Sequence, residues 1–279
     1  MKIQVGIAVL AASLLVGCGS SLKSGVGNLS AADVTGNWQI QSSANSTTAS
    51  PQGIVLLGAL ENSGSQVSGS FRFTNLAQPD ACGSNEVVSL SGAVGSKNEL
   101  TLTSAALPNG TTIKVSIKIM NAQPYSGIGT VEVVGRGCAV ASAPAIGSQV
   151  ASTTGTFTGT LSPGAAGAPD SGSPGTAMVT LTQSAEPDAD GQFTASGTLS
   201  YQFGACSGSV PLNGKVSGVG ISFWDIIFTS SGGQEQVNLS GTTNLAATQI
   251  QAGYLSLTPA PCSADPNSSA TFNGQLNRK

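Results

Sequence analysis

Short runs in which apolar and polar residues alternate recur along this chain from about position 35 to its end, and they constrain its fold more than any other feature. Alternation with a period of two places one row of side chains in a core and the other in solvent, as in a half-buried β-strand. Gly, Asn and Ser separate the runs and indicate hairpin turns. The runs do not follow the 3.6-residue apolar period of a helix. The sequence therefore predicts an all-β protein.

The runs form two groups of eight. Eight consecutive strands joined by short turns make a meander, and such a meander can close into a small barrel that has no exposed edges. We therefore expect two tandem antiparallel up-and-down barrels. The expected strands are 35–42, 53–61, 66–75, 86–94, 98–105, 111–120, 127–134 and 147–152 in the first unit, and 155–161, 176–184, 191–203, 209–217, 219–229, 235–242, 249–257 and 270–276 in the second.

The spacing of four of the five cysteines indicates a duplication. Cys82 and Cys138 lie 56 residues apart, as do Cys206 and Cys262, and the second pair follows the first by 124 residues. In an oxidising compartment outside the cytosol, four thiols are read as two disulfides, and equal spacing favours Cys82–Cys138 and Cys206–Cys262 among the three possible connectivities. Each bridge is expected to stabilise its unit by about 4 kcal/mol on the chain-entropy model.

Local similarities support two copies of one unit, over 34–152 and 153–279. Gly-Asn-Trp at 36–38 parallels Gly-Thr-Phe at 155–157, and 68–73 parallels 196–201.

A pair of immunoglobulin-like β-sandwiches is the alternative fold, because the Cys–Cys spacing of those domains is comparable. In them the first Cys lies within a strand and a Tyr precedes the second Cys by two positions. Here Cys82 and Cys206 lie in turn-like sequences, and Arg136 and Ala260 occupy the Tyr positions. These residues favour barrels with a disulfide at the rim, and the sandwich stays open as the alternative.

The N-terminus has the layout of a secretory signal. Lys2 precedes an apolar run over 3–17 that has no ionisable residue. A run of about 15 residues is shorter than the roughly 20 that a membrane-spanning helix needs. Its end, Leu15-Val16-Gly17-Cys18, resembles the lipobox of bacterial lipoproteins. This resemblance implies that residues 1–17 are removed as a signal peptide and that Cys18 is acylated.

The lipobox resemblance also implies a location. Similar lipoproteins carry diacylglycerol and palmitate chains, and stable attachment to a membrane needs at least two chains. Gly19, rather than Asp, follows the lipidated cysteine, which in lipoproteins of this kind is compatible with sorting to the outer membrane. Residues 18–33 are rich in Gly, Ser and Ala and are expected to form a flexible tether. We therefore expect an exported, lipid-anchored envelope protein.

Two Cys-bearing β units behind a lipobox resemble the tandem lipoproteins of soil acidobacteria. The segments that carry this resemblance are 35–40, 155–161, 179–183 and 189–194. It implies no particular activity. Gly36-Asn37-Trp38 is similar to the opening motif of lipocalin-like barrels, and this similarity implies a barrel that holds a small apolar ligand.

Composition excludes several classes of function. Charged residues make up 8% of the chain, and removing residues 1–17 takes away one of ten basic residues and none of the 13 acidic ones, which leaves a net charge of −4. Without a basic cluster, nucleic acid is not expected as a partner. The chain has no histidine, so Ser-His-Asp and Cys-His catalysis are excluded. No Cys-x-x-Cys occurs, and we expect no cofactor and no metal.

Three aromatic residues, Trp38, Phe157 and Trp224, are candidates to line a ligand cavity or to pack in the core. Next to the last of them, Asp225 is either a buried functional carboxylate or a side chain that points outward while Phe223 points inward.

The acidic segment 186–191 has two interpretations, a weak calcium loop or a hairpin turn. An enzyme would need a cleft in which Asp225, Lys114 or Lys118 converges with other polar groups. We expect instead a non-catalytic binding or adhesion module whose partner is an envelope or extracellular protein. The alternative is a lipocalin-like carrier of a small apolar ligand, and an enzyme is the third hypothesis.

Peptide mapping by mass spectrometry, without reduction, tests the cysteine assignments together. We expect an acylated Cys18 as the N-terminal residue, Cys82 linked to Cys138, and Cys206 linked to Cys262. Links between the two units, or an unmodified Cys18, would contradict them.

Overall fold

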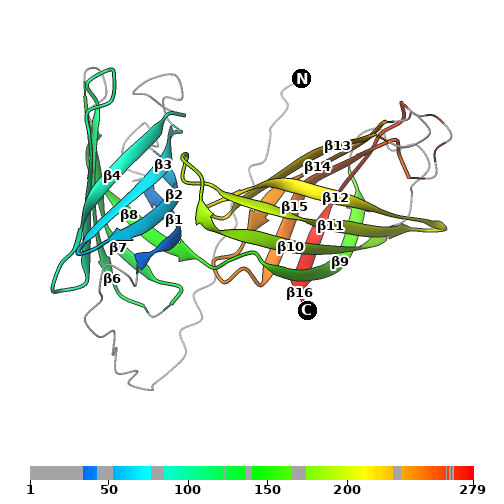
Figure 1. Cartoon of the computed structure of the whole chain (residues 1–279), viewed down its shortest axis with the longest axis horizontal. Coiled ribbons are helices and arrows are strands. Elements are labelled where there is room, and N and C mark those ends of the chain that lie inside the picture. The colour runs from blue at the N-terminus through cyan, green and yellow to red at the C-terminus, as the bar shows by residue number, and fades with distance from the viewer. Residues whose placement is uncertain are drawn as a thin grey trace, which may run out of the picture.

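The computed structural model describes residues 34–42, 53–76, 85–121, 123–135, 140–164, 174–228, 234–261, 263, 265 and 267–279. These residues contain no α-helix, and hence none long and apolar enough to cross a membrane. Their strands form two closed antiparallel barrels of eight strands each (Figure 1). The expected pair of up-and-down barrels is therefore confirmed, and the β-sandwich alternative is wrong.

In the first barrel the strands follow chain order around the wall, and the sheet closes where β1 pairs with β8, Trp38 opposite Gln149. Its strands are β1 (Gly36–Ser42), β2 (Ile54–Ser63), β3 (Gln66–Asn75), β4 (Val87–Val94), β5 (Glu99–Ser104), β6 (Thr112–Ile119), β7 (Ser126–Val134) and β8 (Val140–Val150).

The second barrel repeats this topology and closes where β9 pairs with β16, Leu161 opposite Gly274. Its strands are β9 (Gly155–Pro163), β10 (Gly175–Pro187), β11 (Phe193–Phe203), β12 (Cys206–Ser217), β13 (Gly220–Phe228), β14 (Gln234–Thr243), β15 (Gln249–Thr258) and β16 (Ala270–Arg278).

β8 is the strand whose expected bounds differ most, because it begins at Val140 rather than near position 147. Its first half is rich in Ala and Ser and contains Pro144, which cannot donate a ladder hydrogen bond. Pro144 nevertheless lies opposite Thr130 on β7, and the register between the two strands shifts nearby, between Val131 and Val133. Closure of the barrel thus imposes a strand on a sequence with weak β character.

The two barrels begin in the same way, which fits an internal repeat. Gly36 and Gly155 open β1 and β9 with φ values of 130° and 151°, a region that disfavours residues with a Cβ. Two residues later, Trp38 and Phe157 are both 0% exposed.

Large side chains fill the described interior of the first barrel. Trp38, Phe71 and Phe73 are each 0% exposed, and Nε1 of Trp38 donates a hydrogen bond to the carbonyl oxygen of Val34 at 2.7 Å. The interior of an eight-stranded barrel is just wide enough for such side chains to fill it.

The second barrel is filled in the same manner. Phe157 and Phe223 are fully buried, and the rings of Phe203 and Phe272 stack with centroids 4.0 Å apart. A hollow lumen would leave its lining side chains accessible to a water-sized sphere, and Phe157 and Phe223 are 0% exposed.

Candidate functional site

Hydrogen bonds and an apolar contact join the two barrels at a junction between described residues. Hairpin turns at one end of the second barrel face the outer wall of the first, over β1–β3 (Figure 1). Residues on that wall point away from the first core, so the sequence alone gives them no reason to be buried.

Asn37 forms the central contact of the junction. Its Nδ2 donates to the carbonyl oxygen of Gly218 at 2.8 Å, and its Oδ1 accepts from the Gly218 amide at 2.7 Å. Gly218 lies in the β12–β13 turn with φ of 54°, a conformation that glycine adopts readily. Asn37 points outward from β1 and is still only 3% exposed, because the turn covers it. Beside it, Oε1 of Gln39 accepts from the Val219 amide at 3.3 Å.

An apolar contact accompanies these hydrogen bonds. Ala59 lies on the outward row of β2, yet it is 1% exposed and belongs to the hydrophobic cluster of the second barrel. The wall of the first barrel therefore contributes to the core of the second.

Residues 151–154 connect the two barrels, and hydrogen bonds attach them to two segments of the second barrel. Gln183 of β10 accepts through Oε1 from the Thr153 amide and the Thr153 hydroxyl, each at 2.9 Å. The Ala151 amide donates to the carbonyl oxygen of Leu245, in the β14–β15 turn, at 2.8 Å. Thr153 is 0% exposed, so this connection is part of the packed structure.

Arg278, near the end of β16, reinforces the same region. Its Nε donates to the carbonyl oxygen of Ala247 at 2.8 Å, and its Nη2 donates to that of Ser152 at 2.9 Å. The guanidinium carbon also lies 5.1 Å from the ring centroid of Phe157, within range of a cation–π interaction.

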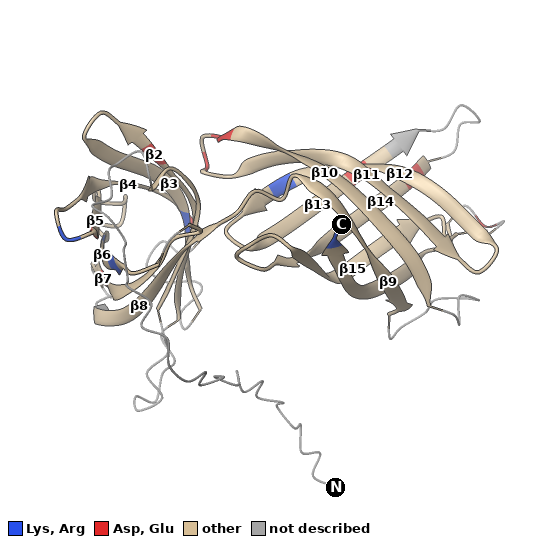
Figure 2. Ribbon diagram, turned by 90° about the horizontal axis from the view of Figure 1, so that it is seen from below, with Lys and Arg blue, Asp and Glu red and all other residues tan. Residues whose placement is uncertain are grey.

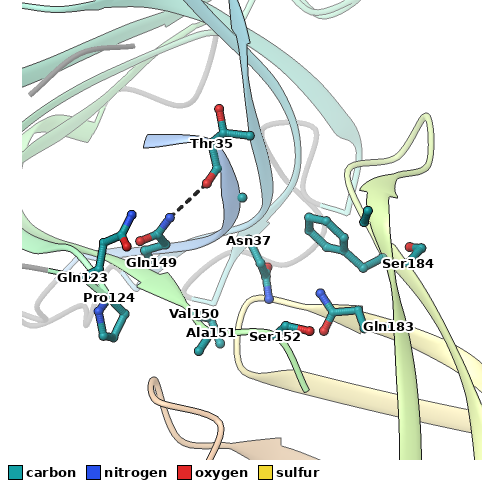
Figure 3. Close-up of a pocket in the computed structure, with 13 residues that line it drawn as sticks. Thr35, Asn37, Gln123, Pro124, Gln149, Val150, Ala151, Ser152, Gln183 and Ser184 are labelled. Carbon is teal, nitrogen blue, oxygen red and sulfur yellow. Dashed lines mark hydrogen bonds between the residues drawn. The ribbon is translucent and has the colours of Figure 1, made fainter. Parts of the chain in front are cut away.

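A cleft of about 520 Å³ lies beside this junction (Figure 3). Nε2 of Gln149 donates to the carbonyl oxygen of Thr35 at 2.9 Å on one side, and Gln183 lies on the other. None of the lining residues is charged, so the cleft offers amide and hydroxyl hydrogen bonds without an acid, a base or a thiolate. The lining residues are Thr35, Gly36, Asn37, Gln123, Pro124, Gln149, Val150, Ala151, Ser152, Gln183, Ser184, Ala185 and Phe193.

A second hollow of about 520 Å³ lies on the outer wall of the second barrel, over β9–β11. Threonine hydroxyls, Met178 and Tyr201 line it. Burial raises the pKa of the Tyr201 hydroxyl, and the carboxylate of Glu235 raises it further. The Tyr201 ring packs against the core of the second barrel, with its centroid 5.5 Å from that of Phe203.

The three aromatic candidates differ in burial. Trp38 and Phe157 pack in the two cores, as one of the two interpretations has it. Trp224 is 54% exposed and lies on the outer wall, so its assignment to a cavity or a core was wrong. The reason is register, since Phe223 occupies the inward position and is 0% exposed.

Asp225, Lys114 and Lys118 line none of the clefts formed by described residues. Lys114 and Lys118 are exposed on β6 of the first barrel, where Lys114 lies 3.7 Å from Glu132. Asp225 is on β13 of the second barrel and accepts a hydrogen bond from Nδ2 of Asn213 at 2.6 Å. The described residues also contain no cluster of three or more Cys, Asp or Glu side chains that could hold a metal ion.

The acidic segment 186–191 forms the hairpin turn between β10 and β11. Oδ1 of Asp188 accepts from the amides of Asp190 and Gln192 at 3.0 and 2.9 Å, and Oδ2 lies 2.7 Å from Nζ of Lys215. Partial burial raises the pKa of this carboxyl, but the Lys215 hydrogen bond and the two amides outweigh it, and the net pKa is lowered.

Most of the predicted covalent chemistry falls outside the described residues, namely Cys18, Cys82, Cys138 and Cys262. Cys206 begins β12, opposite Phe203, and is disulfide-bonded. The two pairings and the lipidation stay predictions.

No known family model matches this chain, and no curated protein sequence matches it. Its function is therefore inferred from its own residues. Sequence reasoning missed Asn37, Gly218 and Gln183, because nothing local distinguishes a junction amide from any other polar residue on an outer wall.

Replacing Asn37 with alanine is expected to destabilise the protein. It leaves the Gly218 amide and carbonyl buried without partners, which costs about 2 to 4 kcal/mol for the two groups. Urea unfolding measures the loss, with Thr103→Ala, at an exposed position of β5, as the control. Equal stability of the two variants would contradict the role of Asn37.

The Asp188–Lys215 pair predicts a pH dependence. Because the folded-state pKa of Asp188 is lowered, its contribution is complete above the unfolded-state value of about 4 and is lost as pH falls through the folded-state pKa. The two side chains are partly exposed, so the effect stays below about 1 kcal/mol. Asp188→Asn should be less stable than the wild type at neutral pH, and the difference should vanish in acid. A pH-independent difference would contradict this origin.

Proposed function

We propose that this protein is an exported bacterial lipoprotein whose two barrels form a non-catalytic binding or adhesion module, attached to the membrane through lipid on Cys18. The proposal combines the lipobox-like segment Leu15-Val16-Gly17-Cys18 with the architecture of the described residues.

The filled interior of the barrels carries the binding part of the proposal. Trp38, Phe71 and Phe223 point inward and are 0% exposed. A carrier of a small apolar ligand needs an enclosed cavity of a few hundred cubic ångströms. Where side chains occupy that space, only the outer surface of the barrels is available to bind a partner. The filled interior therefore argues against the lipocalin-like carrier.

The outer surface has a composition suited to neutral, polar contacts. Hydroxyl side chains pair across neighbouring strands, Thr156 with Thr180 at 3.3 Å and Ser200 with Ser209 at 3.2 Å. Charged residues are few and scattered over both barrels (Figure 2). Short hydroxyl side chains hydrogen-bond a partner without the large conformational entropy cost of ordering Lys or Glu.

The hydrogen-bonded connection at residues 151–154 supports a module whose two barrels keep one relative orientation. Two barrels joined by a packed connection present their outer walls in a fixed relative orientation, and preorganised surfaces bind with a smaller entropic cost.

Thermal unfolding with benzene tests whether the lumen is filled. Benzene should leave the Tm of the wild-type protein unchanged, since large side chains fill the described interior of both barrels. It should raise the Tm of Phe71→Ala, because that substitution opens an apolar cavity of the kind that binds benzene. Saturable stabilisation of the wild type by benzene, or by a larger apolar ligand, would favour the carrier.

A further inference from the structure

Two aromatic side chains project from the outer wall of the second barrel, on strands that flank β14. Trp224 of β13 is 54% exposed and Tyr254 of β15 is 44% exposed. The register aligns Trp224 with Asn238 of β14, and aligns Tyr254 with the next outward residue of that strand, Ser240. With a strand spacing of about 4.8 Å and a rise of about 3.3 Å per residue, the two Cα atoms lie about 12 Å apart.

A β-bulge gives Tyr254 its outward direction. Ala252 is buried, so strict alternation would also turn residue 254 inward. The register shifts between Ser240 and Gly241 on β14, and between Ala252 and Leu255 on β15. As a result Tyr254 faces solvent, and Leu255 and Leu257 take the inward positions. Bulges commonly re-aim a side chain in this way next to functional sites.

Uncharged polar side chains occupy the wall between and beside the two rings. Asn238 and Ser256 share a row with Trp224, and Ser222 and Ser240 share a row with Tyr254. These four polar side chains make no hydrogen bond to another described residue. We call the whole set the aromatic face: Ser222, Trp224, Asn238, Ser240, Tyr254 and Ser256.

We propose that the aromatic face binds a neutral polysaccharide chain. A pyranose ring has an apolar surface of C–H groups that packs against an aromatic ring, and a rim of hydroxyls that hydrogen-bonds with amides and hydroxyls. The aromatic face offers both, with two rings separated by a distance that a short run of linked sugars spans. This proposal rests on the proposed binding module and names the class of its ligand.

Charge and surface pattern select this ligand over others. The aromatic face carries no charged side chain, which matches an uncharged polymer. Asp225, which follows Trp224 in the sequence, is half-buried and already accepts a hydrogen bond from Nδ2 of Asn213. A protein partner would require a contiguous apolar core of interface residues, and here polar side chains separate the two rings.

The test uses the full mature lipoprotein in detergent micelles. Hexasaccharides of β-1,4-linked glucose, mannose and xylose are titrated separately by calorimetry and by tryptophan fluorescence, with polygalacturonate as the charged comparison. We expect saturable binding of at least one neutral hexasaccharide, weakened at least tenfold by Trp224→Ala and by Tyr254→Ala. Ile128→Ala, at a 55% exposed apolar position of the first barrel, is the matched control and should bind as the wild type does.

The polysaccharide proposal is overturned if no neutral hexasaccharide binds, if neither aromatic variant weakens binding, or if polygalacturonate binds more tightly. Circular dichroism of each variant shows whether its fold is intact, and because both side chains project outward, we expect that it is. Capture of an envelope protein that depends on Trp224 would overturn the polysaccharide assignment while leaving the proposed binding module in place. A benzene-binding lumen in the wild type would instead overturn the module itself.

Discussion

Closure of each eight-stranded sheet on itself is the constraint on which the rest of the structure depends. When β1 meets β8 and β9 meets β16, none of the described strands is left with an unpaired edge. An open sheet with few charged residues would be prone to pair with other chains, since charged edge residues are a usual protection. Closure removes that risk and lets Ser and Thr, in place of Lys and Glu, cover the outer wall.

Closure also decides where function can reside. An eight-stranded barrel has a narrow interior, and Trp38, Phe71 and Phe223 occupy it. In the proposed binding module, recognition is therefore assigned to the outer wall, where the junction and the aromatic face differ from the regular hydroxyl pattern. At both places the burial of a side chain differs from what its strand position predicts. Asn37 is buried although it points away from its own core, and Tyr254 is exposed although alternation would bury it.

Local pattern was sufficient to predict the strands and the barrels, because period-two alternation is a property of neighbouring residues. It was insufficient at β8, where closure rather than propensity makes Pro144 part of a strand. The interpretation of Trp224 failed because one position of register separates core from solvent. The Asn37–Gly218 contact joins residues 181 positions apart, and no local signal encodes it. The bulge at Tyr254 is likewise visible only in the pairing of β15 with its neighbours.

The central claim is that two filled barrels behave as one rigid body, held by the Asn37–Gly218 contact and the packed connection at residues 151–154. Its most direct test is the distance distribution between two spin labels, introduced as unnatural amino acids at the exposed positions Thr103 and Ser209 so that the cysteines are untouched. The account predicts one narrow distribution that broadens in Asn37→Ala. A broad distribution in the otherwise wild-type protein would contradict it.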